Sequence, residues 1–494
     1  MIIRDSNDTG RLPTSHHQPV QGAAVIITLP LAGPTKQDRS IQVNGQRSIN
    51  MYPAIKDPGS KADLIMYSHP GLLKKTTVGL GPIRGNALEW QGNLYWITGS
   101  SVYKQGPTNT YTLITGSLLT SGTRIVMDGG RTYFMIVDGT YGYYCDGTTL
   151  TRITDADFPV PTHVAYLDGY FIVNDVDTDN FYINTTVEDP TAWAALDFAT
   201  ANARPDENLA LSVVGKDLYI VGGESTQIYF NSGNADFPFD PYPGALPVGI
   251  EAQYSIVSSS SGLFYLATSR EGGRFIVNVT GQSFRVISDQ ELNWQIGQMT
   301  TTSNAYAWFR RQAESSFYEI TFPSSGKTYS YNVETGLWSE LKSYGINFFR
   351  GAGYGFLANK AFVGDYDNGN IYQLDFATYT DDTNAYIRKR VTRVIHSKGK
   401  QLSVRMLMLD ADAGVGLITG QGSDPQVMMR YSTDGGHTWS SELWADLGAI
   451  GEFDRRPQWD NLGTGRDWVF EFSVSDPVEF NMFNIHADVV ECRT

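Results

Sequence analysis

The sequence contains little cysteine and no long apolar run. Its two cysteines, Cys145 and Cys492, stand far apart, so no disulfide framework is expected and a reducing cytoplasm suits folding. The first 22 residues lack the apolar core of a signal peptide. The apolar segment Ala23–Gly33 is too short to cross a bilayer and contains Pro30. The sequence therefore predicts a protein without a membrane anchor, made in the cytoplasm.

Positive charge is also scarce. The chain has 37 Lys and Arg against 52 Asp and Glu, a net charge of −15, and a sequence pI near 4.9. Proteins that hold nucleic acid by its phosphates are basic overall, so this balance argues against that class. An acidic surface can still serve DNA where the duplex must pass without sticking.

What the sequence does contain is a repeated strand–turn–strand pattern rich in aromatic residues. Copies start about forty to fifty residues apart, which is the period of a four-stranded propeller blade. Within each copy, apolar residues alternate with the two-residue period of a pleated strand. We predict an all-β chain with a propeller of six or seven blades over residues 84–384. The copies are Gly92–Gly106, Arg131–Gly147, Asp168–Asn184, Lys216–Phe230, Ser261–Val279, Asn304–Phe322 and Asn359–Asp375.

The flanks of the repeats differ in composition. Residues 1–22 are polar and predict a flexible arm, and residues 23–83 contain short strands that lead into the propeller. Residues 385–494 read as a separate β-domain whose alternating strands would bury their faces in a sandwich of two sheets. The N-terminal strands are candidates to join that sandwich.

Several segments imitate nucleotide or metal motifs without completing them. Gly326–Thr328 reads Gly-Lys-Thr, but a P-loop needs a glycine where Thr321 stands. The acidic turns Asp175–Asp179 and Asp365–Gly369 lack the glycine or the bidentate Glu of a calcium loop, and Asx turns account for both. His16–His17 has no further ligand at metal-binding spacing. We therefore expect no metal, no cofactor and no catalytic residues.

One sharp motif lies in the C-terminal region. Ser432, Asp434, Gly436 and Trp439 match the Asp-box, a β-hairpin common in sialidase propellers. The Asp434 carboxylate can accept bonds from the N–H groups of the turn, Gly436 tolerates a positive φ, and Trp439 can pack beneath the hairpin. The motif predicts a structural hairpin and says little about function.

The Asp-box raises the alternative of a carbohydrate-binding or sialidase-like propeller, such as a phage receptor-binding protein or a glycosidase. That chemistry needs paired carboxylates and a set of substrate-binding arginines. Candidates such as Arg310, Arg311 and Glu319 are too scattered to assign to a site. In sialidases the box also recurs across several blades, whereas here it occurs once and outside the repeats.

A basic stretch follows the propeller in this acidic chain. One interpretation is a solvated pair of strands with alternating charges, and the other is an interface with an acidic neighbour or with DNA. Since the surrounding acids repel duplex DNA, we predict a protein–protein contact. The stretch contains Arg388, Lys389, Arg390, Arg393, Lys398 and Lys400.

Both ends of the chain resemble a known family. Asn50–Pro53 (Asn-Met-Tyr-Pro) is followed by a polar loop and by a strand that ends at His69–Gly71 (His-Pro-Gly). Near the C-terminus come Gly422–Pro425, the Asp-box hairpin, Ile450–Phe453 and Ser475–Pro477, in that order. This arrangement resembles the tail-hub proteins of short-tailed bacteriophages, which are also called nozzle or packaged-DNA stabilisation proteins.

The resemblance implies a non-enzymatic structural protein of the phage tail. It implies a homo-oligomeric ring, a hexamer, below the portal-adaptor protein, with a tail fibre, spike or needle protein beneath it. The lumen of such a ring retains packaged double-stranded DNA and conducts it during ejection without specific binding. The carbohydrate-binding propeller remains the alternative.

Overall fold

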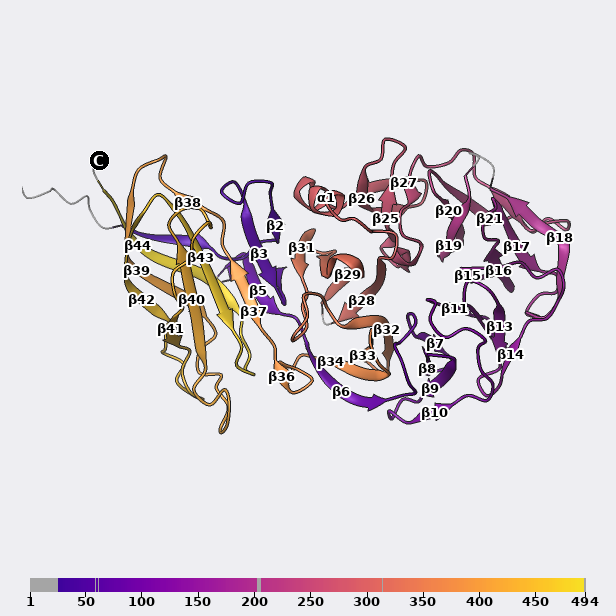
Figure 1. Cartoon of the computed structure of the whole chain (residues 1–494), viewed down its shortest axis with the longest axis horizontal. Helices are drawn as coiled ribbons and strands as arrows, with labels where there is room; N and C mark the ends of the chain where they lie inside the picture. Colours follow the sequence, from indigo (N-terminus) through magenta and orange to yellow (C-terminus); the bar gives the residue numbers. More distant parts are fainter. Residues whose placement is uncertain (1–24, 58, 61, 202–205, 313, 493–494) are drawn as a thin grey trace, which may run out of the picture.

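The computed structural model describes residues 25–492 except residues 58, 61, 202–205 and 313. The predicted arm, residues 1–22, and the pair His16–His17 lie outside this range. Figure 1 shows a propeller beside a sandwich, and nearly all described elements are strands. The exceptions are helix α1 (Gln290–Gly297) and two 3₁₀ turns, η1 (Gln253–Ser255) and η2 (Pro323–Ser325).

The propeller has seven blades among the described residues, within the predicted range of six or seven. Each of the first six blades is an antiparallel sheet of consecutive strands, and in the fifth both β23 and β24 pair with β25. Blades one to three contain β7 (Leu88–Trp90), β8 (Asn93–Thr98), β9 (Ser101–Gln105) and β10 (Tyr111–Leu113); β11 (Val126–Gly129), β12 (Phe134–Val137), β13 (Gly142–Cys145) and β14 (Leu150–Arg152); and β15 (Val164–Leu167), β16 (Tyr170–Asn174), β17 (Asn180–Asn184) and β18 (Trp193–Thr200). Blades four to six contain β19 (Asn208–Val214), β20 (Asp217–Gly222), β21 (Thr226–Asn231) and β22 (Phe239–Pro241); β23 (Gly249–Ile250), β24 (Val257–Ser259), β25 (Gly262–Thr268), β26 (Arg274–Thr280) and β27 (Ser283–Val286); and β28 (Tyr306–Gln312), β29 (Ser315–Phe322), β30 (Lys327–Asn332) and β31 (Leu337–Glu340).

The seventh blade closes the propeller with a strand from the start of the chain. Its three inner strands are β32 (Gly351–Leu357), β33 (Lys360–Asp365) and β34 (Asn370–Asp375), and its outer strand is β6 (Gly71–Thr77). Two short strands, β35 (Thr380–Asp381) and β36 (Asn384–Ala385), extend the same sheet. The boundary predicted at residue 84 is therefore wrong, because the propeller begins at β6.

Both faces of a blade strand are buried, because each blade packs between two neighbours. In β8, Tyr95 and Ile97 join a cluster with Phe134 of the second blade, whereas Leu94 and Trp96 join a cluster with Ile371 of the seventh. All four are no more than 1% exposed. The alternation in the sequence thus divides residues between two cores rather than between core and solvent.

The sandwich consists of two sheets that enclose one apolar core. The first has the order β4 (Met51–Ile55), β5 (Leu64–Ser68), β44 (Met482–Glu491), β39 (Leu402–Ala411) and β42 (Gln458–Gly465), with β1 (Val25–Pro30) also pairing with β44. The second has the order β3 (Gly45–Ile49), β37 (Arg388–Val391), β43 (Asp467–Val474), β40 (Gln426–Ser432) and β41 (Leu443–Asp446), with β2 (Lys36–Gln37) on β3 and β38 (Ile395–His396) on β43. Strands from both ends of the chain therefore build it.

The propeller and the sandwich share one sheet. β3 of the sandwich lies parallel to β31 of the sixth blade, with Ile49 opposite Glu340. This contact joins the two sheets into an eleven-stranded sheet that runs from β28 to β41. The two parts are thus connected by backbone hydrogen bonds, such as that from the Asn50 N–H to the Glu340 carbonyl, as well as by the chain.

Candidate functional site

The junction is organised around Asn50, the first residue of the Asn-Met-Tyr-Pro segment. Its amide nitrogen donates to the carbonyls of Lys342 and Ile387 at 3.0 and 2.9 Å, and its side-chain oxygen accepts from the Lys342 N–H at 2.9 Å. Its backbone has a φ of +57°, which Asn adopts more readily than most residues. The Asn50 side chain therefore links the sandwich to two chain segments that leave the propeller, one at Lys342 just after β31 and one at Ile387 just before β37.

The His-Pro-Gly segment begins the strand that closes the propeller. His69 is buried, with Nδ1 3.1 Å from an Arg310 guanidinium nitrogen and Nε2 3.3 Å from the Ser339 hydroxyl. Burial and the charge of Arg310 hold the pKa of His69 well below its ordinary value, so the ring is neutral. At Gly71 a Cβ would lie 2.2 Å from the carbonyl oxygen of Thr378. Only glycine fits that approach.

The residues proposed for the carbohydrate alternative do not form a site. Arg310 and Glu319 form a buried ion pair at 2.6 Å. Glu319 also accepts from the Trp308 indole at 2.7 Å, so its carboxylate is satisfied inside the sixth blade. Arg311, the next residue on β28, is exposed on the other side of the strand. The chain itself uses the pair to pack a blade, and no substrate can reach it.

The basic stretch is divided by the pleat of β37, which corrects the predicted interface. Arg388 and Arg390 are 0% and 1% exposed and point into the sandwich. Arg388 donates to the carbonyls of Asp476 and Val478. Burial lowers the pKa of Arg388 to about 10 and that of Arg390 to about 9. Neither residue can contact a partner, and reversing their charge would disrupt the fold.

Arg390 holds together the segment that enters the sandwich. Its guanidinium donates to the carbonyls of Leu31 (2.8 Å), Gly33 (3.1 Å) and Pro34 (2.9 Å). It also donates to the Ser48 hydroxyl at 2.8 Å, on the strand beside it. The charge is dispersed over neutral oxygens, which is how a buried guanidinium without an acid can be accommodated.

The other basic residues of the stretch face outward. Lys389 pairs with Glu471 at 2.9 Å on the outer face of the sheet. Arg393, Lys398 and Lys400 are exposed, and Lys400 pairs with Glu491 at 2.6 Å. Arg393 and Lys398, near one end of the sandwich, therefore remain available to a partner, whereas Lys400 is already paired within the chain.

The Asp-box forms a hairpin between β40 and β41. The Asp434 carboxylate accepts from the N–H of His437 at 3.0 Å and of Thr438 at 2.9 Å, and from the Ser432 hydroxyl at 2.7 Å. The hydroxyl and N–H of Thr438 hold the pKa of Asp434 below its ordinary value. Trp439 is half-buried, with the Arg430 guanidinium 5.4 Å from its ring centre. The hairpin belongs to the sandwich and lies outside the propeller.

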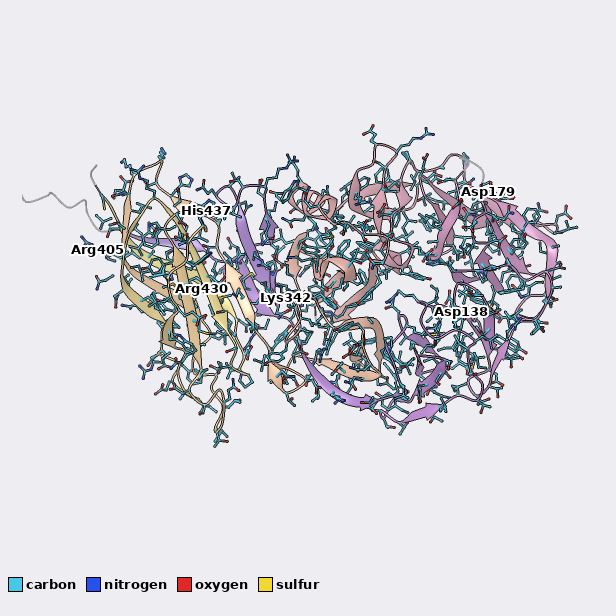
Figure 2. All side chains as sticks on the ribbon, in the orientation of Figure 1. Asp138, Asp179, Lys342, Arg405, Arg430 and His437 are labelled. Carbon is cyan, nitrogen blue, oxygen red and sulfur yellow. The ribbon has the colours of Figure 1, made fainter. Side chains whose placement is uncertain are left out.

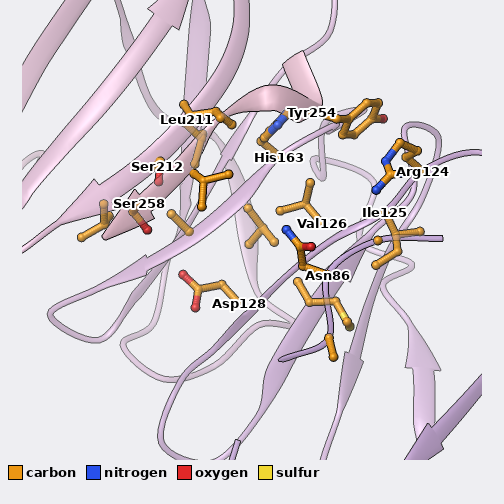
Figure 3. Close-up of a pocket in the computed structure, with 18 residues that line it drawn as sticks. Asn86, Arg124, Ile125, Val126, Asp128, His163, Leu211, Ser212, Tyr254 and Ser258 are labelled. Atoms are coloured by element: carbon orange, nitrogen blue, oxygen red, sulfur yellow. The ribbon is translucent and has the colours of Figure 1, made fainter. Parts of the chain in front are cut away.

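A cavity of about 240 Å³ lies on the propeller axis where the inner strands of several blades meet (Figure 3). Arg124 donates to the Ala352 carbonyl at 2.6 Å and stacks 4.0 Å from the centre of the Tyr306 ring. His163 bonds the Gln253 carbonyl at 3.0 Å, and its burial lowers its pKa to about 4. Burial raises the pKa of Asp128 to about 6. The side chains of Arg124, His163 and Asp128 are therefore already held by contacts within the chain.

The acidic turns and the Gly-Lys-Thr segment are local structure. Asp365 accepts from the Asp367 N–H at 3.0 Å and from the Tyr372 hydroxyl at 3.0 Å. Gly326 has a φ of +59° in the turn between β29 and β30, as a hairpin requires. Among the described residues, no group of three His, Cys, Asp or Glu could hold a metal ion.

Charge is distributed very unevenly along the chain. Residues 126–241, which form blades two to four, contain 18 Asp and Glu but only 4 Lys and Arg, a net charge of −14 out of −15 for the whole chain. Figure 2 labels Asp138 and Asp179 in this region, on the side of the propeller away from the sandwich. Sequence reasoning missed this segregation, although counting charges by blade would have found it.

Two solved structures align with the chain at low similarity. A streptogramin B lyase structure aligns with a TM-score of 0.41 and 10% identity, covering 61% of this chain and 95% of the lyase. PorZ, a surface component of the type-IX secretion system of Porphyromonas gingivalis, aligns with a TM-score of 0.38 and 10% identity, covering 76% of this chain and 46% of PorZ. A search of curated proteins finds no significant match. No helix among the described residues is long and apolar enough to cross a membrane.

Two family models match the sequence directly. One, described as the β-propeller of bacteriophage P22 Gp10, matches residues 27–379. The other, described as the β-sandwich of the same protein, matches residues 387–490. Since the first match alone covers more than half of the chain, the protein belongs to the bacteriophage P22 Gp10 family of structural, non-enzymatic proteins of the phage tail, which stabilise packaged DNA.

Proposed function

We propose that this protein is the tail hub of a short-tailed phage: a hexameric ring below the portal-adaptor that retains packaged DNA and conducts it during ejection. The observation that carries the proposal is the family match over both parts of the chain. The eleven-stranded sheet supports it, because a wall around pressurised DNA needs subunits that do not flex between their domains.

The DNA passage of this ring lies between subunits. The cavity on the propeller axis has a volume of about 240 Å³, that of a sphere roughly 8 Å across, which is narrower than the major groove of duplex DNA. The major groove of duplex DNA alone is about 12 Å wide. A duplex therefore cannot thread a propeller, and copies must surround it.

The acidic edge of blades two to four faces that passage. A net charge of −14 over residues 126–241 repels phosphates and leaves DNA free to slide, whereas a basic wall would hold it. The rest of the chain, almost neutral overall, is left for contacts with the adaptor above and with a fibre, spike or needle protein below.

The test uses DNA-filled phage heads that carry the adaptor but lack this protein. Adding the purified chain should protect the packaged DNA from nuclease and should produce a sixfold ring below the adaptor in electron micrographs. Heads that stay nuclease-sensitive while the chain binds elsewhere, or does not bind, would refute the proposal.

A further inference from the structure

Two apolar surfaces lie at opposite ends of the sandwich. β39 and β44 run its full length, with Leu402 opposite Glu491 at one end and Ala411 opposite Met482 at the other. At about 3.3 Å per residue, the ten residues of β39 place these ends about 30 Å apart. One end carries a protruding apolar tip and the other an open apolar cleft.

The sandwich tip consists of loops 412–425 and 447–457, which lie at the lower end of the sandwich in Figure 1. It exposes Ile418 (83%), Ile450 (60%) and Phe453 (68%). Ile450 and Phe453 belong to the Ile-Gly-Glu-Phe segment by which the sequence resembles its family. The isolated chain gains nothing from large apolar side chains in solvent, so their presence points to a partner.

Backbone bonds hold the sandwich tip in shape. The Gly414 N–H donates to the Leu447 carbonyl at 3.1 Å, and the Gly451 N–H donates to the Gly414 carbonyl at 3.0 Å. Glu452 accepts from the Ala449 N–H at 3.2 Å and from Arg455 at 3.3 Å. The tip is therefore organised before any partner arrives, which lowers the entropic cost of docking.

The sandwich cleft has a volume of about 920 Å³ and lies at the opposite end, near β38. Its apolar lining comes from both sheets and from the loop before β3, where Val43 is 70% exposed. Its rim carries the exposed cation Arg393 and His396. The apolar lining residues include Ile27, Leu29, Val43, Ile395, Leu402 and Val489.

The charges of the two ends are complementary. Segment 392–401, which borders the sandwich cleft, carries three Lys and Arg and no Asp or Glu. Lys400 is paired with Glu491, which also lines the cleft, so Arg393 and Lys398 supply the positive charge of this end. The loops of the sandwich tip carry four Asp and Glu and two Arg. Both arginines already lie beside acids of their own chain, since Arg455 pairs with Asp446 and Arg456 with Asp410. The tip thus presents net negative charge around an apolar centre.

We propose that the sandwich tip of one copy docks in the sandwich cleft of the next copy. Such a contact is heterologous, and it closes into a ring when the rotation per copy is a whole fraction of a turn. Figure 1 shows the propeller projecting sideways from the sandwich, across the direction of the sandwich strands. Sandwiches joined end to end therefore carry all their propellers on one side. The contact rests on the proposed ring and identifies its subunit interface.

The first test pairs charges across the contact. Arg393→Glu and Asp454→Arg each place like charges together and should reduce the fraction of heads carrying a ring by about tenfold or more. The double variant Arg393→Glu with Asp454→Arg should restore it. Arg405→Glu, a matched reversal on β39 at a residue outside both the lining of the sandwich cleft and the loops of the sandwich tip, should assemble like the parent. Single variants that assemble normally, or a double variant that is not rescued, would overturn the contact.

The second test traps the contact in a Cys492→Ser background. Val43→Cys with Ile450→Cys should give a ladder of disulfide-linked multimers up to the closed ring. A disulfide within one chain is excluded, since its Cα atoms must come within about 7 Å and the ends are about 30 Å apart. Leu196→Cys, an even more exposed apolar position on β18 (85% against 60% for Ile450), replaces Ile450→Cys in the control and should give no ladder.

The outcomes separate this contact from the proposed function. If the wild type forms a ring but Val43→Cys/Ile450→Cys gives no ladder, another segment, such as residues 1–24 or the adaptor, fills the sandwich cleft. That result overturns the proposed contact but not the proposed function. Wild-type protein that forms no ring on filled heads overturns the proposed function itself. Phe453→Ala should lose the ring while keeping the parental melting temperature, whereas Leu196→Ala should keep both.

Discussion

Arg47 and Glu340 form a two-point ion pair across the strand contact that joins the sandwich to the sixth blade. The Arg47 guanidinium donates to the two oxygens of Glu340 at 2.9 and 2.6 Å. Burial alone would raise the pKa of Glu340, but the hydrogen bonds and charge of Arg47 hold it below its ordinary value. The charge of Arg47 therefore compensates the buried Glu340 carboxylate at the point where the sandwich and the propeller share a sheet.

Removing Arg47 should loosen this junction. Arg47→Met leaves the Glu340 side chain, 3% exposed, without its partner. We expect a loss of about 1.5–3 kcal/mol, typical of hydrogen bonds to charged groups. Calorimetry should show the single transition of the parent broadening or splitting as the sandwich and the propeller uncouple. An unchanged single transition would show that the backbone contact of β3 with β31 suffices.

The division of the basic stretch predicts unequal effects of neighbouring substitutions. Arg390→Met strands the buried carbonyls of Leu31, Gly33 and Pro34 and should cost about 3–5 kcal/mol. Lys389→Met removes an ion pair whose side chains are 25% and 10% exposed. Because Glu471 keeps its second partner, Arg430, the loss should be less than about 1 kcal/mol. Denaturant unfolding of both variants measures the difference. Equal losses would contradict the assignment of the two residues to opposite faces.

The sequence predicted the blades but not the faces of β37. The blade strands were readable because their turns and apolar alternation recur at one period. In the basic stretch, Ile387 and Val391 lie on one face of the strand, and Arg388 and Arg390 lie on the other. The apolar residues therefore predict that the arginine face is exposed, which is the wrong assignment. The arginines point inward because they donate hydrogen bonds to the carbonyls of distant segments, such as those of Leu31 and Val478. Nothing local to β37 encodes that.

Local sequence patterns also could not predict which strand closes the propeller. β6 pairs with β34 about 300 residues later, with Gly71 opposite Asp375, and no spacing rule announces such a partner. The junction residues Asn50, His69 and Gly71 were found only through the family resemblance. Their roles became visible when Lys342, Ser339 and Thr378 were placed beside them.

Gly71→Ala tests the closure directly. Its Cβ would lie 2.2 and 2.7 Å from the carbonyl oxygens of Thr378 and Thr380, so the backbone must move and β6 must separate from the seventh blade. We expect a lower melting temperature and faster proteolysis near residue 71. Gly122→Ala, whose Cβ would meet nothing within 4 Å, is the matched control and should unfold like the parent. Equal stability of both variants would contradict a tight closure.

The Asp-box predicts a local defect in the sandwich. Asp434→Ala removes the acceptor for the N–H groups of His437 and Thr438 and should cost about 1–3 kcal/mol. Asp434→Asn keeps one oxygen and should lose less. Hydrogen exchange at the two amides should rise in the alanine variant, while exchange in the propeller should not change. Protection that persists at both amides would mean that the turn does not depend on the carboxylate.

Acid should weaken the propeller through His163. Its pKa falls from 6.5 to about 4 on folding because burial disfavours the cation, while its bond to the Gln253 carbonyl acts in the opposite direction. Below about pH 6.5 the unfolded chain therefore binds a proton that the folded chain does not, and stability falls as the pH is lowered towards 4. Because a tenfold change in proton affinity corresponds to about 1.4 kcal/mol, this group alone costs on the order of 3 kcal/mol by pH 4.

Asp128 acts in the opposite direction in the same cavity. Burial raises its pKa from 3.8 to about 6, so the folded state gains stability as the pH falls from about 6 to about 3.8, which partly offsets the histidine. His163→Gln removes one titration and Asp128→Asn the other. Unfolding free energies measured between pH 7 and pH 4 should therefore decline less steeply for His163→Gln than for the parent, and more steeply for Asp128→Asn. A parental slope that neither variant changes would place the acid sensitivity elsewhere, with His69 beside Arg310 as the next group to replace.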